Sequence, residues 1–142
     1  MKNWEELIDP ENEAREKFFA YLLRKTSTRK QSQEYLRRMK LSESLMSEAE
    51  DAGLIDDGAY ARLFADGHAS WGNMKIEYEL SLRGVSRENI RLALDDIADE
   101  AERAREISDS LRKSGIDDRK IKSRLISRGF TNRAVNEALM TK

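Results

Sequence analysis

The chain has 142 residues, enough for one ordinary domain; 37% of them are charged and 39% hydrophobic, and a mean hydropathy of −0.77 indicates a thin core with much of the chain facing water. Because it contains no cysteine and a single histidine, disulfides, thiolate metal sites and two-histidine metal motifs are excluded. No apolar run is long enough to span a membrane, and residues 1–6 lack the apolar segment of a secretion signal, so a cytoplasmic location is expected.

The formal net charge of −1 conceals a segregation of charge along the chain. Residues 15–40 carry nine bases and two acids, and residues 103–142 carry eleven bases and five acids. Between them, residues 41–57 carry six acids and no base. A polyanion responds to local potential, so the two basic blocks are candidate contacts for nucleic acid, although a single such block is more often a solvated helix face.

Helix start signals recur through the first 53 residues, and apolar residues follow each of them at helical spacing. One proline and seven glycines leave few breaks between these segments. Three helices are therefore predicted here. They start at the N-cap and first-turn proline Asp9-Pro10, at the capping box of Thr28 and Gln31, and at the N-cap Ser42, and the third ends at Gly53.

The same signals continue to the end of the chain and predict six more helices. Few β-branched residues alternate anywhere, so no strand is expected. The starts are the cap Asp57, the link Trp71-Gly72-Asn73, the cap Ser86, a position near Asp99, and the caps Asp117 and Thr131. Helices end at Gly84, Gly115 and Gly129.

Residues 76–94 and 121–139 are similar at a shift of 45 positions. Both contain the string Arg-Gly-apolar-hydroxyl, in which glycine closes one helix in the left-handed conformation and the hydroxyl caps the next. A weaker third copy lies 44 residues further upstream. Lys40 occupies its glycine position, so that corner is expected to be less tightly wound.

This period, with three helices in each copy, predicts an all-α protein of three tandem three-helix repeats that form an elongated, curved helical array. The predicted divisions are an N-terminal tail at residues 1–9 and repeats at residues 10–53, 54–97 and 98–142.

Motifs of catalysis and cofactor binding are missing: the sequence has no P-loop, dinucleotide fingerprint or nucleophile elbow. His68 lies at a helix end, where it either caps the helix or faces solvent. The acidic residues between Asp95 and Glu102 match no calcium loop and are better explained as a solvated helix junction. We therefore expect no enzyme activity, no metal and no cofactor.

Two helical stripes of bases are the candidate binding surfaces. Arg29, Gln33, Arg37 and Lys40 share one stripe by spacing, and Lys120, Arg124 and Arg128 share the other. Such residues make sequence-independent phosphate contacts that weaken with salt. The full candidate set is Arg24, Lys25, Arg29, Lys30, Arg37, Arg38, Lys40, Arg112, Lys113, Arg119, Lys120, Lys122, Arg124 and Arg128.

The passage Gly53-Leu-Ile-Asp-Asp-Gly-Ala-Tyr-Ala61 resembles the signature of the RecX family of recombinase regulators, Gly-apolar-apolar-Asp-Asp-x-x-aromatic-Ala. Downstream, Gly72, Ile76, Leu80 and Gly84 are spaced like that family's second repeat. Upstream, residues 14–36 are similar to its first repeat. The resemblance covers residues 14–139.

This resemblance implies three tandem three-helix repeats that lie in the groove of the RecA–DNA filament. It implies inhibition or modulation of the recombinase in DNA repair, recombination and the SOS response, with some direct DNA binding. For this chain we expect DNA binding that is weak or occurs through the filament, and action as a monomer. It implies no catalytic residues. Family members are often more basic than this chain. A helical-repeat nucleic-acid-binding or architectural factor that acts without a recombinase is the alternative, and a scaffold for an unrelated protein is a third possibility.

Overall fold

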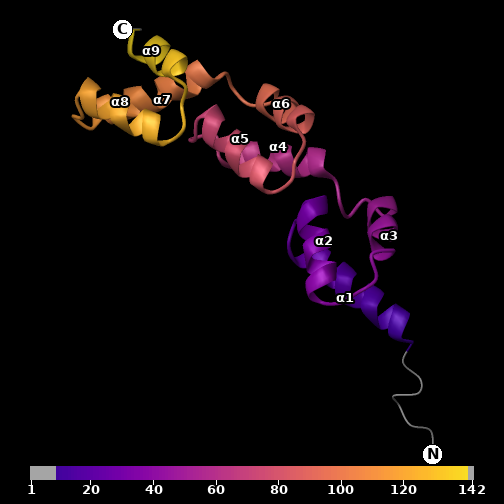
Figure 1. The fold of residues 1–142 in the computed structure, drawn as a ribbon. Coiled ribbons are helices and arrows are strands. Elements are labelled where there is room, and N and C mark those ends of the chain that lie inside the picture. The colour runs from indigo at the N-terminus through magenta and orange to yellow at the C-terminus, as the bar shows by residue number, and fades with distance from the viewer. Residues whose placement is uncertain (1–8, 141–142) are drawn as a thin grey trace, which may run out of the picture. The chain divides into compact units, whose positions relative to one another are not determined.

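The computed structural model describes residues 9–140, which form nine helices and no strand (Figure 1). The predicted all-α class is therefore confirmed, whereas residues 1–8 of the predicted tail lie outside the described part. The helices are α1 (Pro10–Arg24), α2 (Arg29–Arg38), α3 (Leu45–Asp51), α4 (Asp57–Gly67), α5 (Asn73–Leu82), α6 (Arg87–Asp95), α7 (Glu100–Lys113), α8 (Asp118–Ser127) and α9 (Asn132–Met140).

The chain divides by its internal contacts into two compact units, residues 1–60 and 61–142. In the first unit, α1, α2 and α3 enclose a core around Phe18, Leu36 and Ala49, which are completely buried. The predicted capping box opens α2: the Thr28 hydroxyl accepts the Gln31 amide at 3.2 Å, and the Gln31 side chain accepts the Thr28 amide at 3.1 Å.

The corner after α2 differs from the prediction. Lys40 adopts the left-handed conformation, with φ of +56°, and the Leu41 amide donates to the Leu36 carbonyl at 2.8 Å. The expectation of a looser corner at Lys40 is thus wrong. Leu36 is fully buried and Leu41 packs against the same core, so packing holds a lysine in a conformation that costs about 1–2 kcal/mol for a residue with a Cβ.

Two predicted caps are also wrong. The Asp56 carboxylate, not that of Asp57, accepts the Ala59 amide at the start of α4. The Asp57 carboxylate accepts the Arg29 amide at 2.8 Å instead, and so satisfies an orphan donor at the start of α2. Helix α3 begins later than expected, at Leu45, because the chain after Ser42 first makes a turn in which the Ser42 hydroxyl accepts the Ser44 amide at 3.3 Å.

In the second unit, α5 and α8 bury the apolar positions that the repeat predicts for them. Ile76 and Leu80 of α5 are completely buried, as are Ile121 and Leu125 at the equivalent positions of α8. The two glycine corners also match: each glycine has a positive φ, and the next residue donates its amide to the carbonyl five positions earlier. These bonds join Val85 to Leu80 and Phe130 to Leu125, both at 3.1 Å.

The start of α5 and the end of α8 meet backbone to backbone. The Gly72 amide donates to the Arg128 carbonyl at 2.9 Å, and the Met74 amide donates to the Gly129 carbonyl at 3.1 Å. A Cβ on Gly72 would lie 2.1 Å from the Gly129 carbonyl carbon, so only glycine permits this approach. We call this contact the glycine joint; it fixes α5 to α8 within the second unit.

Candidate nucleic-acid interface

Helix α8 presents four exposed bases. The Asp117 carboxylate caps the helix by accepting the Lys120 amide at 3.0 Å, and burial of Ile121 and Leu125 fixes the inward face. The remaining positions of the helix then face solvent. We call the exposed set Arg119, Lys120, Lys122 and Arg124 the α8 cations.

None of the α8 cations lies within ion-pair distance of a carboxylate among residues 9–140. By helical spacing, Lys120 and Arg124 lie on one flank of the buried face and Arg119 and Lys122 on the other. Lys113 is exposed at the end of α7, and Arg128 is half-buried beside the glycine joint. The positive charge of α8 is therefore available to an anion on both flanks.

Arg112 does not belong to this available charge. Its Nε donates to Asp118 Oδ1 at 2.9 Å, and its guanidinium lies 3.8 Å from Asp109. The hydrogen bond to Asp118 raises the pKa of the Arg112 guanidinium. Arg112 thus links the end of α7 to the start of α8.

The bases of α2, in the first unit, have close partners. The Arg29 guanidinium is 3.1 Å from Glu50 and that of Arg37 is 3.7 Å from Glu43. Arg38 lies over the Tyr35 ring, 5.6 Å from its centroid. Much of the positive charge predicted for this stripe is therefore compensated within the unit.

The other candidates of the first unit are exposed. Arg24 ends α1, Lys25 follows it, and Lys30 lies in the first turn of α2. Lys40 lies beyond the end of α2, in the left-handed corner, so helical spacing does not place it on the stripe with Arg29 and Arg37. The structure thus leaves Lys120 and Arg124 of the α8 stripe exposed, with Arg128 half-buried just beyond the end of α8, and it shortens the α2 stripe.

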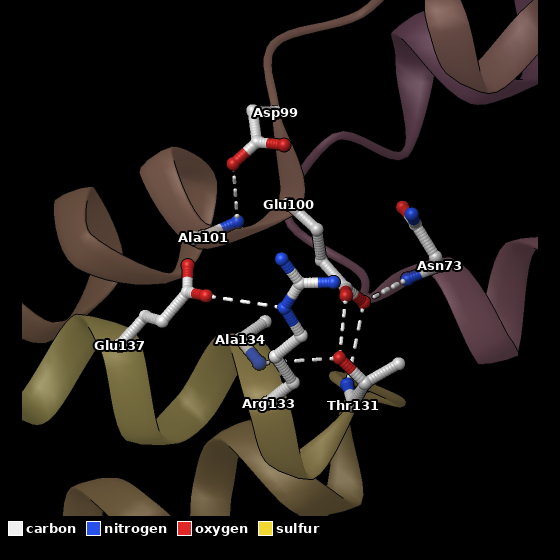
Figure 2. A pocket seen from close by; sticks show the side chains of 8 residues that line it. All are labelled: Asn73, Asp99, Glu100, Ala101, Thr131, Arg133, Ala134 and Glu137. Atoms are coloured by element: carbon white, nitrogen blue, oxygen red, sulfur yellow. Dashed lines mark hydrogen bonds and ion pairs between the residues drawn. The ribbon is translucent and has the colours of Figure 1, made fainter.

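A polar network beside the glycine joint escaped the sequence analysis. The Glu100 carboxylate accepts the Asn73 amide at 2.7 Å and the Thr131 hydroxyl at 2.7 Å, and so bridges the starts of α5 and α9 (Figure 2). Asn73 is the first residue of α5, and Thr131 directly precedes α9; amides at such helix starts lack intrahelical partners and attract a carboxylate. The signal that could have found Glu100 is its place directly after the α7 cap Asp99, in the first turn of a helix.

Arg103 completes this network from the inside of the unit. Its buried guanidinium donates to the carbonyls of Ala98, Ala69 and Trp71, at 2.8, 3.1 and 2.5 Å, and to the Asn73 side chain. Burial lowers the pKa of Arg103, although Glu100 and Asp99 act in the opposite direction. Carbonyl oxygens therefore replace the water that this cation loses, and the link before α5 is held rigidly.

Figure 2 shows the surface cavity beside Glu100, where several of the lining residues are joined by hydrogen bonds or ion pairs. Arg133 pairs with Glu137 at 3.2 Å, and the Asp99 carboxylate caps α7 through the Ala101 amide. The lining residues are Asn73, Asp99, Glu100, Ala101, Thr131, Arg133, Ala134 and Glu137. Among residues 9–140, no three acidic or histidine side chains gather as metal ligands would.

His68 takes the first of its two predicted roles. Its Nδ1 lies 2.7 Å from the Phe64 carbonyl oxygen, which can only accept, so His68 donates and caps the end of α4. The ring stacks on Phe64, with centroids 4.1 Å apart, and lies tilted against Trp71, with centroids 4.2 Å apart. Lys75 covers the Trp71 ring in turn.

No helix within residues 9–140 is long and apolar enough to cross a membrane.

Comparison with known proteins finds matches to one family. A family model described as RecX, second three-helix domain, matches residues 56–94. The regulatory protein RecX of Caldanaerobacter subterraneus subsp. tengcongensis is 30% identical over 136 residues, which cover 89% of this chain and 69% of that protein.

Solved structures show the same fold. The crystal structure of RecX from Lactobacillus salivarius has a TM-score of 0.76 and 24% identity, over 91% of this chain and 94% of that chain. A crystal structure of regulatory protein RecX has a TM-score of 0.73 and 20% identity, over 91% of this chain and 72% of that chain. These matches support the all-α helical-repeat fold.

Proposed function

The chain belongs to the RecX family of regulatory proteins, and on that premise we propose that it binds the filament of a RecA-type recombinase on DNA and inhibits or tunes it. The three repeats at residues 10–53, 54–97 and 98–142 are part of this proposal, as is action by a monomer without enzyme activity.

The observation that carries the proposal is the set of uncompensated α8 cations. Four exposed bases on one ten-residue helix make a strong local positive potential in a chain whose net charge is −1. Phosphates on nucleic acid are the natural counterparts of such a surface, because binding them releases condensed counterions. The contact would be independent of base sequence.

Inhibition requires preference for one state of the filament. A regulator that binds equally to growing and arrested filaments shifts no equilibrium. We infer that the chain binds best where recombinase protomers and DNA are already assembled in one geometry, and that occupation of this site opposes the rearrangement needed for extension. The α8 cations supply the DNA part of this recognition.

A strand-exchange assay with a RecA-type recombinase and single-stranded DNA tests the proposal, with filament ATPase measured in parallel. Titration of this protein is expected to reduce both activities at concentrations comparable to the recombinase. A protein that leaves strand exchange and ATPase unchanged at saturating excess would contradict it.

The same cations favour one second candidate, a module that binds nucleic acid without a recombinase. Affinities for bare DNA and for the recombinase–DNA filament separate the two. Filament docking predicts much tighter binding to the filament, whereas the stand-alone module predicts equal affinity for both and an equally steep dependence on salt.

A further inference from the structure

Helix α5 is apolar on two opposite faces. Its inner face buries Ile76 and Leu80 completely. Its outer face carries Met74, Tyr78 and Leu82, and these residues are 57%, 62% and 53% exposed. These three residues, which we call the α5 stripe, follow one another at a spacing of four and so form one ridge along the helix.

The fold does not require the α5 stripe. Single exposed apolar residues are ordinary, but three in one row form a patch of the kind that marks interaction sites. Methionine, tyrosine and leucine adapt well to a partner surface, and tyrosine in particular is enriched among residues that dominate binding energy. A ridge with a spacing of four is also the ridge that helices most often use when they pack against another helix.

The charges beside the α5 stripe define its partner further. Glu79 is paired with Arg83 at 2.7 Å, and the Lys75 amine lies over the Trp71 ring, 4.2 Å from its centroid. Glu77 is exposed and has no cation within ion-pair distance among residues 9–140. The complementary surface is therefore an apolar face of a protein helix with a base opposite Glu77.

The glycine joint couples the α5 stripe to the α8 cations. Met74, the first residue of the stripe, donates its amide to Gly129, and the turn at Gly129 follows α8 directly. A partner that engages both surfaces must present apolar protein surface and phosphate at a fixed separation. A protein assembled on nucleic acid meets this requirement, whereas bare DNA or an unbound protein meets only half of it.

We propose that the α5 stripe is the protein-contacting half of the interface and binds an apolar, base-flanked helix face of the recombinase subunit, while the α8 cations contact the DNA. The inference rests on the proposed function. It assigns the two kinds of contact to two separate helices of one compact unit, and it predicts that they respond differently to salt.

The test compares Met74→Ser/Tyr78→Ser with the matched variant Leu63→Ser/Leu92→Ser, whose residues are 68% and 46% exposed in the same unit but lie on α4 and α6. Binding to recombinase–DNA filaments and to bare single-stranded DNA is measured over a series of salt concentrations, and circular dichroism checks folding. The stripe variant is expected to lose at least tenfold in filament affinity with an unchanged salt dependence and unchanged affinity for bare DNA. Tyr78→Phe, which keeps the ring, is expected to bind the filament like the wild type.

The outcomes separate the two proposals. A folded stripe variant that binds the filament as tightly as the matched variant overturns this inference and leaves the proposed function standing. Loss of bare-DNA binding by the stripe variant also overturns it, because the stripe would then contact DNA. A wild-type protein that does not bind the filament at all overturns both.

Discussion

Helices α2 and α8 are alike in length and in their number of bases, but they differ in the carboxylates that lie beside those bases. Each is ten residues long and carries four bases, and each was predicted to present a basic stripe. In the structure, Arg29 and Arg37 of α2 face Glu50 and Glu43, whereas the bases of α8 have no carboxylate partner within residues 9–140.

The difference comes from the acidic block at residues 41–57. Glu43 and Glu50 lie in this block and compensate the bases of α2, and Asp57 of the same block caps that helix. Near α8, the acids are used locally: Asp117 caps the helix and Asp118 holds Arg112. A basic run is thus available to an external anion only where the fold brings no acids to it.

The largest expected effect is on the glycine joint, the backbone contact that fixes α8 to α5. Gly72→Ala would place a Cβ 2.1 Å from backbone atoms of Gly129 and Phe130, and neither can move without breaking the glycine joint. We expect the second unit to lose at least about 3 kcal/mol of stability. Denaturant unfolding followed by circular dichroism measures this loss.

Gly115→Ala is the matched control for that variant. Gly115 has a positive φ, of +86°, whereas Gly72 has a φ of −75°, and no atom lies within 4 Å of a Cβ placed on Gly115. Its loss is expected to be about 1 kcal/mol, the cost of the left-handed backbone alone. Equal losses for the two variants would show that the close approach at Gly72 does not matter.

The next largest effect concerns the bases themselves. Lys120→Glu/Arg124→Glu is expected to weaken filament binding by about 10–100-fold and to reduce the salt slope by about 2, because two phosphate contacts are lost. Neither side chain has an ion-pair partner within residues 9–140, so the unfolding midpoint should stay within a few degrees of the wild type.

Arg29→Glu/Arg37→Glu makes the same charge change on the other helix. It is expected to change filament affinity by less than about threefold, but to cost about 1 kcal/mol of stability, because each new carboxylate faces Glu50 or Glu43. If this pair weakens binding as much as the α8 pair, the ion pairs of α2 open in the complex and the comparison fails.

Local signals account for most of the fold. Caps such as Thr28 and Asp117 are specified within three residues, and glycine corners within six, so the sequence predicts them directly. The same locality explains the errors. Asp57 has the chemistry of a cap for α4, and only its position beside α2 reveals that it accepts the Arg29 amide instead.

The candidate site is harder to predict from the sequence, because its contacts join residues that are far apart in the chain. Helical spacing predicts which bases share a flank, but not that Glu50 lies opposite Arg29, which is 21 positions away. The Glu100 bridge joins residues 27 and 31 positions apart. Spacing alone groups the residues of the α5 stripe on one face of the helix. Only the structure shows that Ile76 and Leu80 form the buried face; without it, every apolar residue of this helix is interpreted as a core residue.

The smallest effect concerns Lys40, the base of the first unit that the structure removes from its stripe. Lys40→Gly relieves the left-handed backbone strain of a residue with a Cβ, while glycine makes the unfolded chain more flexible, so a net gain of about 0.5–1 kcal/mol is expected. Lys40→Ala removes the same charge but keeps the Cβ, and its stability should match the wild type in denaturant unfolding. A gain of equal size for both would mean that the charge, not the backbone, is unfavourable there.

Filament binding by either variant should equal that of the wild type, because Lys40 does not share the flank of Arg29 and Arg37. A loss of binding in both variants would show that Lys40 belongs to the binding surface.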